Sequence, residues 1–461
     1  MSEAQREFSS FRDPSGVIFL RNGTLYRQVN GCYQRQYDAL LQSGLYEELV
    51  KSGDLVRHSE VDVPPLTGQA YRVICPKRVP MISYPYEWSF GMLQDAALTT
   101  LRVHRAALAK GMILKDASAY NIQFIRGRAT LIDTLSFDFY RDGQPWIAYG
   151  QFCRHFLAPL LLMANSDIRL NLLLRDWIDG IPLDLAAVLL NGKGGLFAKQ
   201  HIVWHAKAVR QHDEDGKKSS QTRDLKLPLN SQIAMVDSMI RNIQGLRLPA
   251  VQTEWGDYYD HTNYTPQAAE QKQALVQDFL KQSAAHTVWD LGANDGRFSR
   301  LALEWGASVV ALDIDPLAVE RGYLWVKRTH EALLPLLCDL TNPSPAIGFA
   351  CAERKSLFDR QMPDCIMALA VIHHLAISNN LPLPMIAEWS ASITNTLIIE
   401  FVPKTDSQVQ LLLKTRDDIF PDYTEDGFED AFRRYFSIVK KEKITDSTRI
   451  LYFMKNLQSL K

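Results

Sequence analysis

The feature that most restricts the fold of this chain is a regular alternation of two kinds of segment after residue 265. One kind consists of short apolar runs: TVWDLG, SVVALDID, PLLCDL, CIMALAV and TLIIEFV. Segments with a helical spacing of apolar residues lie between most of these runs, including 298–305, 317–328 and 385–393. Strands that alternate with helices form βαβ units, and continuous apolar strands are buried on both faces of a parallel sheet. We therefore expect an α/β domain built on a parallel sheet.

The end of the chain breaks this alternation. A helical segment at 428–435 is followed by two strand-like runs, SIVKKEKI and RILYFMKN, which only the residues TDST separate. So short a connection can join two strands only in antiparallel fashion. With five apolar runs before it, this hairpin predicts a seven-stranded, mostly parallel sheet whose last strand is antiparallel.

The first half is predicted to contain a small strand-rich lobe followed by a helix-rich one. The segment VIFLRNGTLYRQV predicts a β-hairpin, with Asn22 and Gly23 in its turn. A further strand is expected at 70–75, and helices are expected at 91–109 and 151–164. This half is therefore an α+β region with two lobes.

The length of 461 residues argues for two or three domains. An amphipathic stretch ends before Arg247–Pro249, so we place a boundary near residue 250 and expect two domains, 1–249 and 250–461. The hydrophobic fraction of 46% and the charged fraction of 22% are those of a globular protein. The formal net charge is -1, which argues against generic binding of nucleic acid.

The cysteines give no sign of a metal or disulfide framework. All six are scattered, none form a CxxC pair, and no histidine cluster stands beside them, so we expect no metal site. The N-terminal residues MSEAQREFSS lack the apolar core of a signal peptide, and the longest apolar stretch, 156–164, is too short to span a bilayer. We expect a cytoplasmic protein without a membrane span, and the sequence leaves its oligomeric state open.

The strongest chemical signal is the segment VWDLGANDG. An apolar strand ends at Asp290 and enters a turn with Gly292 and Gly296. Glycine lets the backbone approach a ligand closely, and the helix that follows offers free N–H groups. Asp313 ends the next strand, where a carboxylate can accept hydrogen bonds from both hydroxyls of a ribose. Asp339 follows the third strand, where a carboxylate can accept from an adenine amino group.

DLGANDG followed by ALDID resembles motifs I and II of the class I S-adenosylmethionine-dependent methyltransferases, over about residues 255–461. That fold is Rossmann-like, with a seven-stranded sheet and an antiparallel last strand. The resemblance implies that Asp290 and Gly292 hold the methionine part of the cofactor, S-adenosyl-L-methionine. The implied cofactor site consists of Asp290, Gly292, Asn294, Gly296, Asp313, Ile314, Asp339, Leu340 and Tyr264. Asn294 departs from the family, which often has glycine there, but asparagine tolerates a positive φ.

Two other interpretations of this turn are open. A dinucleotide-binding fingerprint needs G-x-G-x-x-G, whereas this turn has only Gly292 and Gly296 with acidic Asp295 between them. A negative charge there disfavours a diphosphate and suits a cationic sulfonium. A purely structural βα turn is the other alternative, and the acidic residues at successive strand ends argue against it.

Candidate catalytic residues follow the fourth and fifth strands. His373 and His374 come directly after ALAVI, and an aliphatic run followed by HHL resembles the fourth motif of many small-molecule methyltransferases. Either histidine is a candidate base, because the pKa of histidine lies near neutrality. Each is equally compatible with a packing role. Glu400 ends the fifth apolar run, where a charge needs a cavity or a partner.

Aromatic residues gather before the first helix of the C-terminal half. Tyr258, Tyr259 and His261 are predicted to contact the substrate, while Tyr264 is placed at the cofactor. In the methyltransferases the segment before motif I often folds over the cofactor, and aromatic rings attract a sulfonium. A hydrophobic contact between the domains is the alternative.

A second resemblance lies in the first half. Asp116, Asn121 and, after the strand ATLID, Asp133 are spaced as in kinase-like phosphotransferases of the aminoglycoside and choline kinase type. The resemblance implies a two-lobed domain in which the first Asp orients the acceptor and the other two residues hold Mg²⁺ for ATP. Leu114 stands where the family has His, Thr134 follows the second Asp, and neither a glycine-rich loop nor a V-A-I-K lysine is present. We therefore expect a degenerate kinase-like domain.

Together these patterns predict an enzyme, an S-adenosylmethionine-dependent methyltransferase. Its acceptor would be a small molecule, a saccharide or a natural-product intermediate, which the kinase-like domain helps to recognise. IIEFVPKTDSQVQ resembles nodulation-type bacterial methyltransferases. The alternatives are a bifunctional kinase and methyltransferase, or a non-catalytic scaffold and cofactor sensor. The sequence does not identify the acceptor or the atom methylated.

Overall fold

The computed structural model describes residues 4–205, 226–249, 264–414 and 416–460. The chain divides into two compact units. The first comprises Met1–Val251 with Ala346–Lys355, and the second comprises Gln252–Pro345 with Ser356–Lys461.

The first unit begins with a five-stranded antiparallel sheet in the order β1-β2-β3-β5-β4. Its strands are β1 (Gln5–Arg6), β2 (Gly16–Arg21), β3 (Thr24–Asn30), β4 (His58–Glu60) and β5 (Ala70–Pro76), and helices α1 (Gln34–Gln42) and α2 (Leu45–Ser52) lie between β3 and β4 in the chain. The predicted hairpin is confirmed: Arg21 pairs with Thr24, and Asn22 and Gly23 both have a positive φ, as a two-residue hairpin turn requires.

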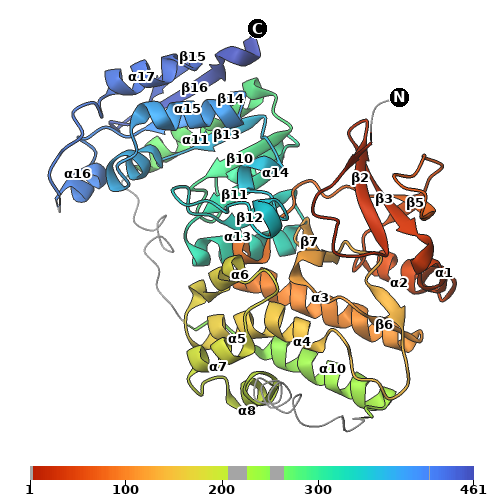
Figure 1. The fold of residues 1–461 in the computed structure, drawn as a ribbon. Helices are drawn as coiled ribbons and strands as arrows, with labels where there is room; N and C mark the ends of the chain where they lie inside the picture. Colours follow the sequence, from red (N-terminus) through yellow and green to blue (C-terminus); the bar gives the residue numbers. More distant parts are fainter. Residues whose placement is uncertain (1–3, 206–225, 250–263, 415, 461) are drawn as a thin grey trace. The chain divides into compact units, whose positions relative to one another are not determined.

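The rest of the first unit is mainly helical (Figure 1). Its elements are α3 (Phe90–Ala109), β6 (Met112–Leu114), β7 (Ile122–Ile125), β8 (Arg128–Leu131), β9 (Phe137–Phe139), α4 (Tyr149–Phe152), α5 (Ala158–Asn165), α6 (Leu173–Asp176), α7 (Leu183–Leu190), α8 (Gly195–Ala198) and α10 (Leu229–Gly245). A π-helical turn, Cys153–Leu157, interrupts the predicted helix at 151–164. Pro159 has no N–H to donate to the carbonyl of His155, which accounts for the altered hydrogen bonding there.

Residues 346–355 belong to the first unit although the chain on either side of them belongs to the second. Glu353 is buried and accepts from Arg12 at 2.5 Å and 2.9 Å. The Phe349 ring stacks on Phe8, and the Arg354 guanidinium lies 4.4 Å from the centre of the Tyr120 ring. An ion pair and ring contacts thus hold this segment in the first unit.

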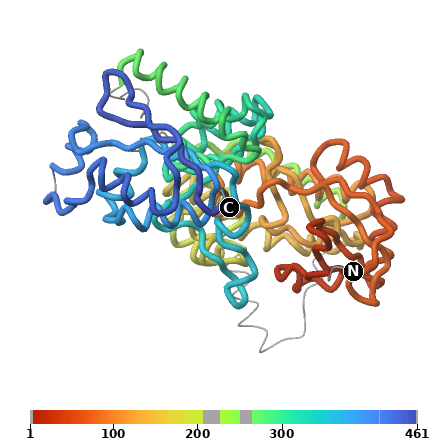
Figure 2. The backbone as a smooth tube through the Cα atoms, turned by 90° about the horizontal axis from the view of Figure 1, so that it is seen from above, coloured from red at the N-terminus to blue at the C-terminus, as the bar shows by residue number. Residues whose placement is uncertain are grey.

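The second unit is built on a seven-stranded sheet in the order β12-β11-β10-β13-β14-β16-β15. The strands are β10 (Thr287–Leu291), β11 (Ser308–Asp313), β12 (Leu333–Leu337), β13 (Cys365–Ala368), β14 (Thr396–Phe401), β15 (Phe436–Lys443) and β16 (Ile450–Asn456). The first five pair in parallel, while β16 runs antiparallel to both neighbours. This confirms the predicted mostly parallel sheet with an antiparallel last strand. The strands β15 and β16 lie in the blue, C-terminal part of the trace in Figure 2.

Side chains alternate across this sheet because successive residues of a strand point to opposite faces. Val288 belongs to a core shared with α11 (Pro266–Ser283), α12 (Ser299–Glu304) and α13 (Pro316–Thr329). Its neighbour Trp289 instead contacts Phe358. The remaining helices of the unit are α14 (Leu357–Arg360), α15 (Leu383–Ile393), α16 (Ser407–Leu413) and α17 (Glu425–Arg433). The strands β10, β11, β13 and β14 are therefore buried on both faces, while the edge strand β15 is largely exposed.

Helix α11 begins at Pro266, and the side chain of Thr265 before it accepts from the backbone N–H of Ala268. Asp315 caps α13 in the same manner. Among the residues that the structure describes, none of the helices has the length and apolar character needed to cross a membrane.

Candidate functional site

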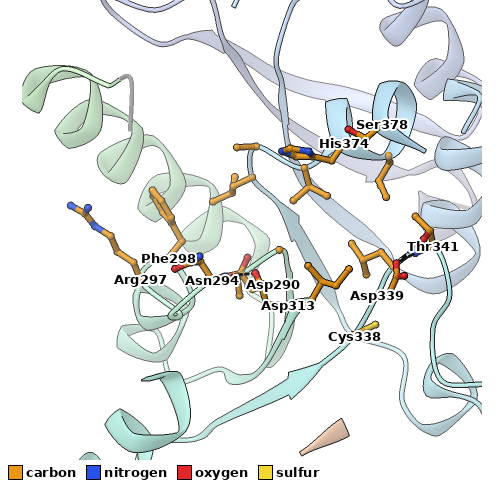
Figure 3. A pocket seen from close by; sticks show the side chains of 18 of the residues that line it. Asp290, Asn294, Arg297, Phe298, Asp313, Cys338, Asp339, Thr341, His374 and Ser378 are labelled. Atoms are coloured by element: carbon orange, nitrogen blue, oxygen red, sulfur yellow. Dashed lines mark hydrogen bonds between the residues drawn. The ribbon is translucent and has the colours of Figure 1, made fainter. Parts of the chain in front are cut away.

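A cavity of about 350 Å³ lies where β10, β11, β12 and β13 end at their carboxyl termini. Figure 3 shows side chains from these strand ends turned toward a common space. Ligands of open α/β sheets bind at this edge. Of the residues predicted to bind the cofactor, those that line the cavity are Tyr264, Asp290, Gly292, Asn294, Asp313, Ile314, Asp339 and Leu340.

The turn after β10 depends on residues with a positive φ. Gly292, Asn294 and Gly296 have φ values of 70°, 51° and 83°. A Cβ at Gly292 would lie 2.4 Å from Cγ2 of Val371, so only glycine fits there. Asn294 adopts the positive φ that its residue type predicted. Gly296 is outside the cavity lining, and its contribution is the shape of the turn.

Asp313 joins the turn to the end of β11. One carboxylate oxygen accepts the backbone N–H of Asn294 at 2.7 Å, and the other accepts that of Asp315 at 2.8 Å. Burial raises the pKa of Asp313 to about 6, against the lowering effect of these hydrogen bonds. The carboxylate is thus held in a fixed orientation at the cavity wall.

Asp290 and Asp339 are held differently. Asp290 accepts from the hydroxyl of Ser299 at 2.6 Å, and burial, with a smaller effect from the charge of Asp313, raises the pKa of Asp290 to about 7. Asp339 accepts from both the backbone N–H and the hydroxyl of Thr341. The three predicted acidic strand ends are therefore brought to one cavity.

The loop after β13 is strained. Ala370 has a φ of 55°, a conformation that a side chain with a Cβ rarely adopts, and Ala370 lines the cavity. The residues that follow form a π-helical turn, His374–Ser378. Strained backbone and π-helical turns both concentrate at functional sites.

The two adjacent histidines are placed differently by this turn. His374 lines the cavity, and burial lowers the pKa of His374 to about 4. His373 is outside the cavity lining and 2% exposed. Its Nδ1 has no hydrogen-bond partner within the described part of the chain. The geometry therefore separates two residues that the sequence could not distinguish.

Glu400 is fully buried in β14 and is outside the cavity lining. Its carboxylate lies 2.7 Å from Nζ of Lys272 and accepts from the hydroxyl of Tyr264. Burial alone would raise the pKa of Glu400, but the charges of Lys272 and Arg449 lower it below its ordinary value. Glu400 is therefore ionised and paired with a cation, as we expected for a charged residue at the end of an apolar strand.

Tyr264 connects Glu400 to a second ion pair. The Tyr264 hydroxyl donates to Glu400 and accepts from Lys272 at 3.2 Å and from Arg449 at 2.9 Å. Arg449 is 1% exposed and also binds the carboxylate of Asp406 at 2.8 Å and 3.2 Å. Two cations, two anions and one hydroxyl thus form a buried network at the edge of the cavity.

Sequence reasoning missed Lys272 and Arg449. A signal for Lys272 exists, because it falls on the buried face of α11 with Ala268 and Val276. A lysine on an apolar helix face needs a buried partner or a polar cavity. Arg449 precedes the last strand without a comparable pattern. Other residues of the lining that were not predicted include Gln273, Arg297, Ser378, Asn379 and Leu412.

Tyr258, Tyr259 and His261, the predicted substrate contacts, lie outside the described residues. Within the ranges that the structure does describe, no cluster of three or more His, Cys, Asp or Glu side chains could hold a metal ion.

The predicted kinase-like residues lie in the first unit. Asp116 accepts from Gln151 at 2.8 Å, and Asn121 donates to Ser136 at 3.5 Å. Asp133 forms an ion pair of 2.6 Å with Arg27 on β3, and its carboxylate also accepts from the backbone of Leu135. The Asp133 carboxylate thus has a protein cation as its partner.

Known structures resemble parts of this chain. The bifunctional kinase-methyltransferase WbdD is 14% identical over 41% of this chain and 39% of its own, with a TM-score of 0.27. The N-methyltransferase NodS from Bradyrhizobium japonicum WM9 is 12% identical over 41% of this chain and 96% of its own, with a TM-score of 0.31. TM-scores this low establish no common fold, so the fold assignment rests on the strand order described above.

No protein-family model matches the chain. Nodulation protein NoeA of Rhizobium meliloti (strain 1021) is 36% identical over 456 residues, which are 97% of this chain and 95% of NoeA. Identity at this level over nearly the full length of both chains leads to one conclusion: the protein belongs to the NoeA family of nodulation proteins.

Proposed function

We propose that the second unit is an S-adenosylmethionine-dependent methyltransferase. One observation carries the proposal: Asp290, Asp313 and Asp339, from three successive strand ends, line one cavity beside the Gly292 turn. A cavity with three acidic side chains suits a cationic sulfonium nucleoside and disfavours a diphosphate. The class I methyltransferase resemblance of the same residues supports this assignment.

The residues of the cavity fit this cofactor. The carboxylate of Asp313 would accept from the ribose hydroxyls, and Asp339 would accept from the adenine amino group. Gly292 would let the methionine part approach the backbone, and a cation beside Asp290 would favour its ionised form. When bound, the cofactor supplies a methyl group on a sulfonium. The contribution of the chain is to position the reactants and to exclude water.

We assign the role of base to His374 rather than to His373. His374 lines the cavity, and its lowered pKa keeps the imidazole neutral at pH 7, ready to accept a proton from a hydroxyl or an amine. His373 is buried behind it, with ring centres 4.1 Å apart. In this assignment His373 supports the ring of His374.

The lining also supports an acceptor with uncharged polar groups. Gln273, Ser378 and Asn379 carry neutral hydrogen-bonding side chains, and Leu375 and Leu412 add apolar surface. Such a mixture suits a small molecule, a saccharide or a natural-product intermediate. The same lining does not discriminate between oxygen, nitrogen and carbon as the methylated atom.

We propose that residues 1–249, which make up most of the first unit, are a degenerate kinase-like domain that helps to recognise the acceptor of the methyltransferase domain, proposed as residues 250–461. The ion pair of Asp133 with Arg27 supports the loss of phosphate transfer. A carboxylate bound to a guanidinium is a poor ligand for Mg²⁺, because the cation would have to displace a charged partner.

Calorimetric titration with S-adenosylhomocysteine tests the proposal. Wild type should bind, and Asp313→Ala should bind about 10- to 150-fold more weakly, since bonds to a charged group contribute about 1.5–3 kcal/mol. Asp278→Asn is a matched control, because Asp278 is an acidic residue of the second unit outside the cavity lining.

Transfer of a labelled methyl group from S-adenosylmethionine to a panel of saccharides and small hydroxylated or amino compounds then tests catalysis. Absence of binding in wild type would overturn the proposal. Tight binding without transfer to any member of a broad panel would favour the cofactor-sensor alternative.

A further inference from the structure

The buried ammonium of Lys272 is the feature of the cavity that the proposed function does not use. Lys272 lies on α11, is 4% exposed and lines the cavity. Its Nζ donates to Glu400 at 2.7 Å and to Tyr264 at 3.2 Å. An ammonium has three N–H donors, so the protein contacts of Lys272 within the described residues use two of them.

Two aromatic rings lie beside this ammonium, and the cavity lies next to it. Nζ lies 4.8 Å from the centre of the Tyr264 ring and 4.8 Å from that of Phe298. Rings offer attraction to a cation but no strong acceptor for a third N–H. A buried charged donor without an acceptor is costly, so this N–H favours an anionic ligand in the cavity.

The position of Lys272 identifies the part of the ligand that it would meet. Phe298, whose ring contacts Nζ, is the last residue of the turn after β10 and directly precedes α12. Burial lowers the pKa of Lys272, and the negative charges of Glu400 and, to a smaller extent, Asp290 oppose this effect. These contacts place the ammonium at the β10 end of the cavity, away from Asp339 after β12. In the proposed function that end holds the amino-acid part of the cofactor.

We propose that Lys272 binds the α-carboxylate of the methionine part of S-adenosylmethionine, through the N–H that faces the cavity. The 2.7 Å ion pair with Glu400 positions this ammonium. The inference rests on the proposed function, because it assigns a residue to the cofactor of that reaction.

Arg297 is the competing cation in the lining. Its side chain is exposed, and Figure 3 shows its guanidinium extending away from the other labelled side chains of the cavity. An exposed, solvated cation gains less from binding a carboxylate than a buried one does. The structure therefore favours Lys272.

The test compares two ligands that differ in the amino-acid part. S-Adenosylhomocysteine carries the carboxylate, and 5′-deoxy-5′-methylthioadenosine has the same thioether nucleoside without it. We expect Lys272→Met to weaken binding of S-adenosylhomocysteine by about 10- to 150-fold, and binding of methylthioadenosine by less than about twofold, as measured by calorimetry.

Loss of Lys272 leaves the charge of Glu400 buried without its cation, which could destabilise the fold and so weaken binding indirectly. The double variant Lys272→Met with Glu400→Leu removes both charges and avoids this effect. Replacing both partners of a buried pair with apolar residues is often tolerated. The double variant should show the same difference between the two ligands. Glu400→Gln alone should lower the affinity for S-adenosylhomocysteine less than Lys272→Met does.

The outcomes separate the two proposals. Equal weakening of both ligands, or loss confined to Arg297→Met, overturns the role of Lys272 and leaves the methyltransferase proposal standing. Failure of wild type to bind S-adenosylhomocysteine overturns the proposed function and this inference with it.

Discussion

The carboxylate of Asp313 accepts the backbone N–H of Asn294 at 2.7 Å, so the end of β11 shapes the turn that follows β10. The other oxygen of Asp313 holds the backbone of Asp315. The residue proposed to bind the ribose is therefore also the residue that fixes the glycine turn beneath it. This dual role makes the protonation state of one carboxylate important for the whole cavity.

The first prediction concerns pH. Burial raises the pKa of Asp313 to about 6, so the carboxylate is ionised above pH 6 and protonated below it. Affinity for S-adenosylhomocysteine should therefore fall on acidification and be about tenfold lower at pH 5 than at pH 7.5. In Asp313→Asn the dependence should be shallower, leaving the contribution of Asp290. Calorimetry across this range measures it, and a flat profile in wild type would contradict the assignment.

The second prediction concerns the hydroxyl of Tyr264. Its three protein partners occupy the hydroxyl, so Tyr264→Phe should lower the free energy of unfolding by about 1–3 kcal/mol and change the affinity for S-adenosylhomocysteine little. Tyr423→Phe is a matched control, because that buried hydroxyl donates to the neutral carbonyl of Val402 and bonds to no charged group among the described residues. Urea titration of both variants gives the comparison. A cost for Tyr264→Phe no larger than for Tyr423→Phe would argue against a charged network.

The third prediction concerns acid stability of the first unit. His104 is buried against Trp146, with ring centres 4.0 Å apart, and burial lowers the pKa of His104 to about 3. A lowered pKa stabilises the folded state above the ordinary value of 6.5, and this contribution is lost as the pH falls below it. Wild type should therefore lose about 2 kcal/mol of unfolding free energy between pH 7.5 and pH 5 that His104→Phe does not lose.

Urea titrations at both pH values measure this difference, and His286→Gln serves as the control, because His286 is exposed. If the difference between His104→Phe and wild type is the same at pH 7.5 and pH 5, then His104 does not titrate as its burial implies.

The fourth prediction concerns the kinase-like residues. Because Arg27 binds Asp133 at 2.6 Å, wild type should neither bind Mg-ATP at millimolar concentration nor hydrolyse it. Calorimetry and a phosphate-release assay test this expectation. ATP turnover that Asp133→Ala abolishes would instead support the bifunctional alternative.

The sequence alone was sufficient for the features that depend on local pattern. The apolar runs predicted the strands of a parallel sheet, and the brief TDST connection predicted the antiparallel hairpin. Asp290 and Asp313 could be placed at strand ends because strand boundaries follow from where apolar residues stop. These features can be read from the sequence because buried residues recur with the period of the strand or helix.

Only the tertiary structure decided which distant side chains meet. Lys272 and Glu400 stand 128 residues apart, and Arg27 reaches Asp133 across two lobes of the first unit. His374 lines the cavity and His373 does not, because adjacent residues at the start of a helical turn point in different directions. An ion pair or a strained turn depends on how the elements pack in three dimensions, and packing leaves no periodic trace in the sequence.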